Sequence, residues 1–309
     1  LTSVQSGAFS GCASLEFEER WSVSFYGKLW SHGWRKSSVQ GCIYSVSRRS
    51  LPTTSQTSNR NTSMTDFYET DEQLGQYMDF HFGPEHFGVA NYPRVCAERC
   101  LSAAKGRGSA LDLGCATGRS TLELARGFER VVGVDLSHRF IQAAETLRRE
   151  GQMTYTLIDE GDLDHTETAS LAELGLEKAA TRVSFEEGDA GHLESHHQGY
   201  DLIFAGNLID RMPDPGAFLR SLHELLDDQG VVVISSPYTL LEDFTPRRNW
   251  VGGYYDNGRP VTVLDGMKAC LGDHFRMMGE PEDTPFVIRE TRRKHQHTLA
   301  QLTVWGRHD

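Results

Sequence analysis

The pattern of hydrophobic and polar positions changes character at Met64. From there on, short apolar runs alternate with amphipathic segments, as in domains that alternate strands and helices. The pattern predicts strands at 110–113, 131–135, 182–186, 200–205 and 230–235, and helices at 71–80, 92–104, 118–127, 137–150 and 214–227. A helix at 264–272 and strands near 275–278, 285–289 and 300–305 complete the domain. The strands are continuously apolar, which is typical of a parallel sheet covered on both faces.

Two segments depart from this alternation. Residues 151–181 are expected to be an insertion, with an apolar stretch at 155–158, an acidic turn and a helix near Ser170–Leu174. Residues 1–63 contain 20 Ser/Thr and show neither a helical nor a strand period, so we expect a disordered N-terminal extension. Two interpretations stand for it: an organellar presequence, or sequence translated upstream of a true start at Met64.

The charge of the chain is uneven. The net charge is −12, but residues 1–63 hold seven basic and three acidic residues, which leaves 24 basic and 40 acidic residues on 64–309. An acidic body disfavours nucleic acid as a partner and favours a small-molecule substrate. No apolar run reaches the ~18 residues of a membrane span, so no membrane partner is expected. The location expected is cytoplasmic, or organellar if the extension is a genuine presequence.

The stretch ALDLGCATGRST, Ala110 to Thr121, carries the strongest chemical signal. A predicted strand enters a turn with small residues at Gly114, Ala116 and Gly118, and a helix follows. The next strand ends on Asp135. This order is half of a nucleotide-binding α/β fold. A dinucleotide loop would require a small residue where Arg119 stands. The D-x-G-x-x-x-G form resembles the S-adenosylmethionine loop of class I methyltransferases, with a phosphate or nicotinamide loop as the alternative.

That resemblance implies a Rossmann-like α/β fold with a mostly parallel seven-stranded sheet and helices on both faces. It also implies where the cofactor lies. Asp135 would accept the ribose hydroxyls, and Asp189 would accept the adenine amino group, with the alternative that Asp189 only caps a turn. Asn207, after strand 200–205, would face the methyl-transfer centre or simply start a helix. The predicted cofactor-binding residues are Asp112, Gly114, Cys115, Ala116, Gly118, Asp135, Leu136, Asp189, Ala190 and Asn207.

Metal binding is not expected from the sequence. The six cysteines lack paired C-x-x-C spacing, and the histidines form no H-E-x-x-H motif. His196 and His197 are adjacent, so their side chains would point apart in any regular element. Methyl transfer from a sulfonium requires positioning and at most a general base.

Four stretches outside the glycine loop look like a single family. They are FYETDEQLGQYMDFHFG (67–83), NLIDRMPDP (207–215), SSPYTLLEDFTPRRNWVGGYYDNG (235–258) and PFVIRETRRKHQHTLAQLTVW (285–305). They resemble the C-terminal methyltransferase domain of ovothiol synthase. The resemblance spans roughly 67–305 and implies methyl transfer to an imidazole nitrogen of mercaptohistidine, a thiolated histidine.

The resemblance also guides the choice of acceptor-side residues. Asn207, Tyr68 and His81 are the catalytic candidates. The substrate-binding candidates are Arg211, Asp210, Tyr77, Tyr255 and Arg247, with Glu69 as a further acid for the substrate amine. For the aromatic residues the alternative is core packing, and for Arg211 it is a surface ion pair.

Complete ovothiol synthases carry an iron sulfoxide synthase region, and residues 1–63 contain no iron-ligand histidine cluster. A separate sulfoxide synthase is therefore a candidate partner. Two other functions stay open: a class I methyltransferase for a different small acceptor, such as a thiol or an amine, and a non-catalytic S-adenosylmethionine-binding partner of a sulfoxide synthase.

Overall fold

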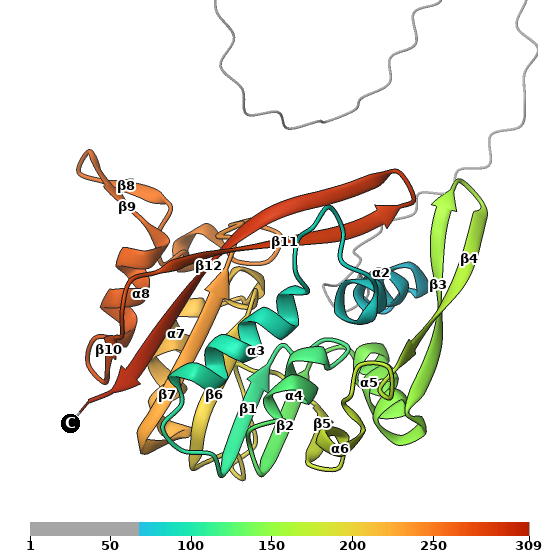
Figure 1. Ribbon diagram of the computed structural model, residues 1–309. Helices are drawn as coiled ribbons and strands as arrows, with labels where there is room; N and C mark the ends of the chain where they lie inside the picture. The colour runs from blue at the N-terminus through green and yellow to red at the C-terminus, as the bar shows by residue number, and fades with distance from the viewer. Residues whose placement is uncertain (1–67, 309) are drawn as a thin grey trace, which may run out of the picture. The chain divides into compact units, whose positions relative to one another are not determined.

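The computed structural model describes residues 68–308 (Figure 1). The extension expected at 1–63 lies outside the described residues. The central sheet has the strand order β10-β12-β7-β6-β1-β2-β5, and β11 pairs with β12 outside this path. Strands β7, β6, β1, β2 and β5 pair in parallel, whereas β12 runs antiparallel to β7, β10 and β11. The predicted fold, a Rossmann-like and mostly parallel sheet with helices on both faces, is confirmed, but the sheet has eight strands where seven were predicted, because β11 adds to the edge of β12.

The elements follow the predicted alternation closely within the sheet. Its strands are β1 (Ser109–Leu113), β2 (Arg130–Asp135), β5 (Val183–Glu187), β6 (Tyr200–Gly206), β7 (Leu226–Ser236), β10 (Phe275–Met277), β11 (Glu282–Thr291) and β12 (Lys294–Arg307). The α-helices are α2 (Asp71–Phe82), α3 (Tyr92–Ala103), α4 (Arg119–Leu124), α5 (His138–Glu150), α6 (Glu177–Ala180), α7 (Pro215–Ser221) and α8 (Val263–Leu271).

Local chemistry explains where the helices begin. The side chains of Thr70, Ser137 and Asp214 each accept a hydrogen bond from a backbone N–H of the first turn of α2, α5 and α7. Asp214 is followed by Pro215 at the first helical position, where a missing N–H costs nothing. Gly151 ends α5 in the left-handed conformation with φ 76°.

Apolar cores cover both faces of the sheet. Helices α3, α4 and α5 bury side chains such as Cys96, Leu122 and Leu147 against one face. Helices α7 and α8 bury residues such as Leu219 and Met267 against the other. The alternating side chains of each strand serve both cores, so Ala110 belongs to the first and its neighbour Leu111 to the second.

Three hairpins extend beyond this framework. Strands β3 (Gln152–Glu160) and β4 (Leu163–Ser170) form one, β8 (Tyr254–Asp256) and β9 (Arg259–Val261) form a small one, and β11 with the first part of β12 forms a long arm. Figure 1 shows the β11–β12 arm running across the top of the sheet towards β3 and β4. Arg289 of β11 donates to Asp159 Oδ1 of β3 at 2.8 Å, which joins the two hairpins.

Two predicted elements were wrong. Residues near 170–174 do not form a helix: they are the end of β4 and a turn, and the helix of this segment is α6. The helix predicted at 214–227 is shorter, since α7 ends at Ser221 and continues as a single 3-10 turn, η2 (Leu222–Glu224), into β7. The inserted segment is mostly a β-hairpin whose second strand is largely exposed, so its sequence lacks the alternation that marks a strand.

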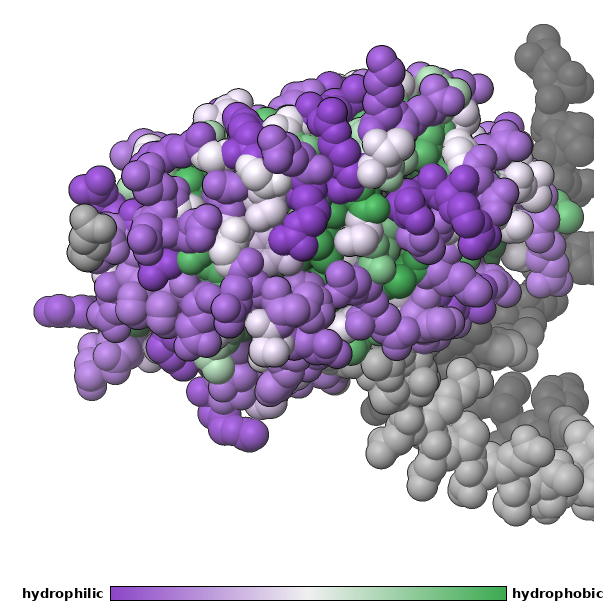
Figure 2. Space-filling model, turned by 90° about the horizontal axis from the view of Figure 1, so that it is seen from below, coloured by the Kyte–Doolittle hydropathy of each residue, from purple (hydrophilic) through white to green (hydrophobic). Residues whose placement is uncertain are grey.

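The surface offers little apolar area on the face in Figure 2, where hydrophilic residues dominate and hydrophobic ones form a narrow group near the centre. None of the helices within 68–308 combines the length and apolarity that crossing a bilayer demands.

Candidate cofactor and acceptor site

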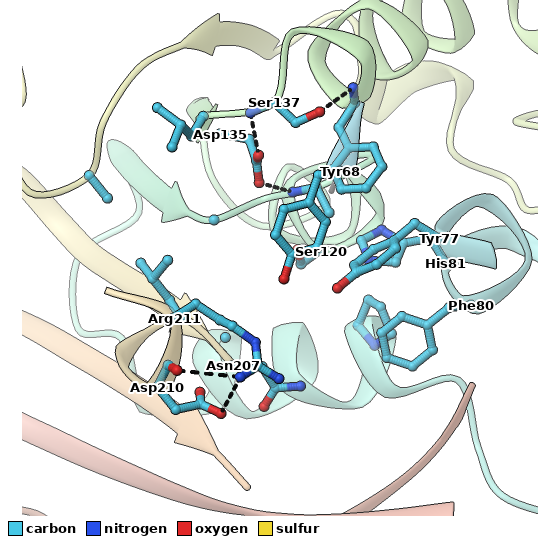
Figure 3. A pocket seen from close by; sticks show the side chains of 18 of the residues that line it. Tyr68, Tyr77, Phe80, His81, Ser120, Asp135, Ser137, Asn207, Asp210 and Arg211 are labelled. Atoms are coloured by element: carbon cyan, nitrogen blue, oxygen red, sulfur yellow. Dashed lines mark hydrogen bonds and ion pairs between the residues drawn. The ribbon is translucent and has the colours of Figure 1, made fainter. Parts of the chain in front are cut away.

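A cavity of about 360 Å³ lies at the carboxyl ends of β1, β2, β5 and β6, within the size range of small-molecule sites. Ligands of open α/β sheets bind at this edge. The cavity brings together twelve residues singled out from the sequence: Tyr68, Tyr77, His81, Gly114, Ala116, Asp135, Leu136, Asp189, Ala190, Asn207, Asp210 and Arg211. Figure 3 shows ten lining residues by name, which converge from α2, the β1 and β2 loops and the turn after β6.

The conformation of the glycine loop depends on packing against the sheet as well as on the needs of the cavity. Gly118 has φ 88°, and a Cβ there would lie 2.4 Å from the Phe185 ring. Gly118 therefore serves packing of loop on sheet and does not line the cavity, contrary to the role expected for it. Asp112 also lies behind the loop, fully buried, where its Oδ2 accepts hydrogen bonds from Ser120 and Thr121 at 2.6 Å each. Burial raises the pKa of Asp112 to about 6.

Asp135 closes the loop from the neighbouring strand. Its Oδ2 accepts from the Ala116 N–H at 2.8 Å and its Oδ1 from the Ser137 N–H at 2.9 Å, as Figure 3 shows. Each carboxylate oxygen retains a second lone pair for a ligand hydroxyl. Burial raises the pKa of Asp135, and the two backbone hydrogen bonds oppose this shift. The arrangement fits a ribose diol held at the end of β2.

The adenine side combines apolar and polar groups. Leu136 is an exposed apolar side chain, and Ala190 and Met212 line the cavity with it. Asp189 lines the cavity but also caps its own turn, since its Oδ1 accepts from the Gly191 N–H at 2.8 Å and His192 Nδ1 lies 3.0 Å from its Oδ2. Both roles considered for Asp189 are compatible with this position.

Asn207 sits at the centre of the cavity rim, directly after β6. Its φ of 52° is left-handed, a conformation that Asn tolerates better than most residues, and it starts no helix. The Tyr92 hydroxyl donates to Asn207 Oδ1 at 2.8 Å and also contacts Ser235 Oγ at 2.7 Å. Because Tyr92 occupies the carbonyl oxygen, the Asn207 amide group is left to donate towards a ligand.

The acceptor side of the cavity is aromatic. The Tyr68 and Tyr77 rings meet edge to face with centroids 6.0 Å apart, and Tyr77 packs on Phe140 at 4.7 Å. Burial raises the pKa of both tyrosines, so their hydroxyls stay protonated at neutral pH. Burial and the nearby Arg119 lower the pKa of His81 to about 3, and the Arg119 backbone N–H donates to His81 Nδ1 at 3.3 Å.

Two charged groups share the rim with Asn207. Asp210 is buried, and its Oδ1 accepts from Ser236 Oγ at 3.2 Å. Its Oδ2 has no hydrogen-bond partner among residues 68–308 and lies 3.7 Å from Arg211 Nη1. The Arg211 guanidinium stacks 4.5 Å from the centre of the Phe244 ring and lines the cavity. Burial raises the pKa of Asp210, and Arg211 opposes that rise.

The structure does not bring every candidate to the cavity. Cys115 is buried beneath the loop. Tyr255 is 77% exposed on the β8–β9 hairpin, and Arg247 stacks 4.8 Å from the Trp250 ring; neither is among the lining residues. Glu69 accepts from the Arg139 backbone N–H at 3.3 Å and does not line the cavity either. The family resemblance suggested Tyr255 and Arg247, but a resemblance in sequence does not tell where a loop points.

Other lining residues were missed by sequence reasoning. The β11–β12 arm contributes Phe286, Ile288, Gln296 and Thr298, and α2 and α3 contribute Phe80 and Tyr92. The apolar residues of 285–289 were assigned to a closing strand, and only the long antiparallel pairing with β12 carries them over the cavity. The helical face of 71–80 was the one available signal for Phe80.

The strand order, the loop after β1, the acid at the end of β2 and the cavity above them define a class I methyltransferase fold with an S-adenosylmethionine site. A family profile described as "Methyltransferase domain" matches residues 90–264, and the chain belongs to this family.

Individual relatives are more distant. A ubiquinone biosynthesis O-methyltransferase of Azorhizobium caulinodans is 24% identical over 134 residues, 43% of this chain and 42% of that protein. An uncharacterized protein of Haemophilus influenzae is 28% identical over 142 residues, 45% of this chain and 46% of that protein. The chain thus spans under half the length of the curated relatives it matches.

Solved structures of similar fold include a magnesium protoporphyrin IX methyltransferase of Synechocystis with bound S-adenosylmethionine. It has a TM-score of 0.48 and 16% identity over 79% of this chain and 95% of that one. The N-methyltransferase NodS of Bradyrhizobium japonicum has a TM-score of 0.44 and 16% identity over 70% of this chain and 94% of that one.

Proposed function

We propose that this chain is an S-adenosylmethionine-dependent N-methyltransferase whose acceptor is an imidazole ring nitrogen of mercaptohistidine, the methylation that completes an ovothiol. The observation that carries the proposal is the acceptor side of the cavity. An aromatic chamber, a guanidinium and a buried carboxylate meet there beside Asn207. A planar heterocycle joined to an amino acid requires these three kinds of contact.

The ring is held by aromatic surfaces. Tyr68, Tyr77 and Phe80 line the part of the cavity nearest α2, and Figure 3 shows both tyrosine hydroxyls directed into the same space as Arg211. Because these hydroxyls are uncharged, they donate hydrogen bonds to ring nitrogen or sulfur without repelling a thiolate.

The amino-acid end of the substrate matches the charged pair on the rim. Arg211 is placed to bind a carboxylate through two parallel N–H donors, and its stacking on Phe244 keeps the guanidinium plane fixed. The unpartnered Oδ2 of Asp210 is a ready acceptor for an ammonium group. Both ends of a zwitterion are thereby matched at one rim.

Proton handling follows from the pKa values. S-adenosylmethionine, held by Asp135 and the loop after β1, would supply an electrophilic methyl carbon to the lone pair of the acceptor nitrogen and would leave as S-adenosylhomocysteine. A neutral imidazole is already nucleophilic near pH 7, since its ordinary pKa is about 6.5. With a pKa of about 3, His81 is too weakly basic to take the released proton and serves as a neutral wall. Because Asp210 faces the substrate ammonium in this arrangement, the ring proton leaves to water after methyl transfer.

Mass spectrometry tests the proposal. The protein is mixed with S-adenosylmethionine and either mercaptohistidine or histidine, and a gain of one methyl on mercaptohistidine supports it. Binding of the cofactor with methylation of neither compound overturns the assignment of acceptor while leaving the fold and cofactor site intact. Product formed only from a different thiol or amine overturns it in favour of that acceptor.

The substrate clamp is tested by a matched pair of variants. Arg211→Ala should raise the KM for mercaptohistidine about tenfold to hundredfold, the value of a lost charge-assisted pair. The affinity for S-adenosylmethionine should change less than threefold. Arg247→Ala removes a nearby arginine outside the cavity and should leave both unchanged. An unchanged KM in Arg211→Ala contradicts the clamp.

A further inference from the structure

A cluster of two imidazoles and a carboxylate lies on the side of β5, outside the cavity lining. Glu186 belongs to β5, and His196 and His197 lie in the turn before β6. The expectation that the two side chains point apart applies to a regular element, and this pair lies outside any helix or strand. Their rings lie 4.0 Å apart between centroids and both face Glu186, because the pair occupies a turn and no regular element.

The donor atoms have the spacing of a metal site. His196 Nε2 lies 3.2 Å from Glu186 Oε2, and His197 Nε2 lies 3.4 Å from the same oxygen. One ligand atom from each of the three residues fits within 4.8 Å of the other two. In a tetrahedral zinc site, with bonds of about 2.0–2.2 Å, neighbouring ligand atoms stand about 3.3–3.5 Å apart. The two histidine–carboxylate distances match that separation, and the two histidines offer ligand atoms within 4.8 Å of each other.

Outer contacts hold the imidazoles in the orientation that a metal requires. His197 is 3% exposed, and its Nδ1 lies 3.0 Å from the Tyr200 hydroxyl. The Nδ1 of His196 lies 3.5 Å from a carboxylate oxygen of Glu194. Each ring thus turns Nδ1 to an oxygen and Nε2 to the centre of the cluster, the arrangement seen around metal-bound histidines.

The electrostatics around the cluster also favour a cation. Glu186 and Glu194 contribute two carboxylates, and Arg130, stacked 5.5 Å from the centre of the Tyr200 ring, is the opposing positive charge.

We propose that Glu186, His196 and His197 bind one Zn²⁺ ion, with water as the fourth ligand. The site spans residues 186–197, and the segment it closes carries Asp189 and Ala190 of the cofactor cavity. Bound zinc ties this segment to β5. The cofactor loop then loses freedom before the cofactor arrives, in addition to the restraint from the hydrogen bond of the Gly188 N–H to the Asp135 carbonyl.

The experiment uses the untagged full-length chain, stripped with a chelator and titrated with Zn²⁺ alone by calorimetry. One equivalent should bind with a dissociation constant in the micromolar range or tighter. His196→Ala, which alters an exposed side chain, and the isosteric Glu186→Gln should each weaken binding at least tenfold. The matched control is His138→Ala, because His138 pairs with Glu187 of the same strand but as a single imidazole.

Hydrogen exchange supplies the second readout. Zn²⁺ should slow exchange of amides in 188–199 in the wild type and not in His196→Ala. Binding of less than one tenth of an equivalent, or equal affinity of wild type and both cluster variants, overturns the proposal. Zinc that binds through the cluster without slowing exchange in 188–199 overturns the link to the cofactor segment.

Discussion

Asp135→Asn is the sharpest test of how the cofactor site is built. The carboxylate accepts one backbone N–H with each oxygen, from Ala116 on the β1 loop and from Ser137 at the start of α5. An asparagine has a single acceptor oxygen. Whichever way the amide is turned, its NH₂ group faces one of these two N–H donors, so one hydrogen bond is lost and the negative charge with it.

The size of the effect follows from those contacts. A hydrogen bond to a charged group contributes about 1.5–3 kcal/mol. Loss of the bond to the loop should lower the melting temperature by about 4–10 °C for a domain of this size. Loss of one acceptor for the ribose should weaken cofactor binding by about tenfold to hundredfold, since 1.4 kcal/mol is tenfold.

The assay is calorimetric titration with S-adenosylhomocysteine, which binds the same site without reacting, together with thermal unfolding. Glu187→Gln is the matched control, because Glu187 pairs in register with Asp135 but is exposed, lies outside the cavity lining and forms an ion pair with His138 at the surface. Loss of the Glu187 charge should change the affinity for S-adenosylhomocysteine less than twofold. Equal affinity of Asp135→Asn and Glu187→Gln would refute the ribose assignment, and an unchanged melting temperature would refute the loop anchor.

Three further outcomes are expected. In Asp112→Asn, the difference in unfolding free energy from wild type should shift by about 2 kcal/mol between pH 4 and pH 8, because a folded-state pKa of about 6 confers stability at low pH that is lost as pH rises through 6; urea unfolding measures it. Arg289→Ala breaks the ion pair between the two hairpins and should speed hydrogen exchange in 152–170, whereas Lys294→Ala, exposed on the same arm, should not; no change in either contradicts the coupling. Gly118→Ala should lower the melting temperature by at least about 5 °C, since a left-handed φ and a clash with Phe185 add together; a smaller loss means the ring moves freely.

The elements on the cofactor side of the cavity could be predicted from sequence because the motifs that indicate them are short and local. A buried strand, a small-residue turn and an acid at the next strand end stand within about 25 residues, and parallel pairing alone brings Gly114 and Asp135 together. Caps such as Ser137 and Asp214 follow equally short rules.

The acceptor half depends on contacts between distant segments. Phe286 reaches Tyr92 only through the long β11–β12 pairing, with ring centroids 4.9 Å apart. Strand β4 carries mostly exposed polar side chains, so its sequence has no hydrophobic period that would predict a strand. The turn that aligns His196 with His197 has no periodic signal at all. In these places the outcome rests on tertiary packing, which one-dimensional patterns do not encode.

The β11–β12 arm and the glycine loop line the same cavity although they lie far apart in the sequence. Most lining residues on the predicted cofactor side fall between Gly114 and Asn207, with Met212 beyond them, whereas the proposed acceptor walls come from α2, from the arm and from Asp210 and Arg211 after β6. Under the proposed assignment, the residues that would select the acceptor lie largely in different stretches of the sequence from those that would hold the methyl donor. Substitutions in α2 or in the arm should therefore change the choice of acceptor more than the affinity for S-adenosylmethionine.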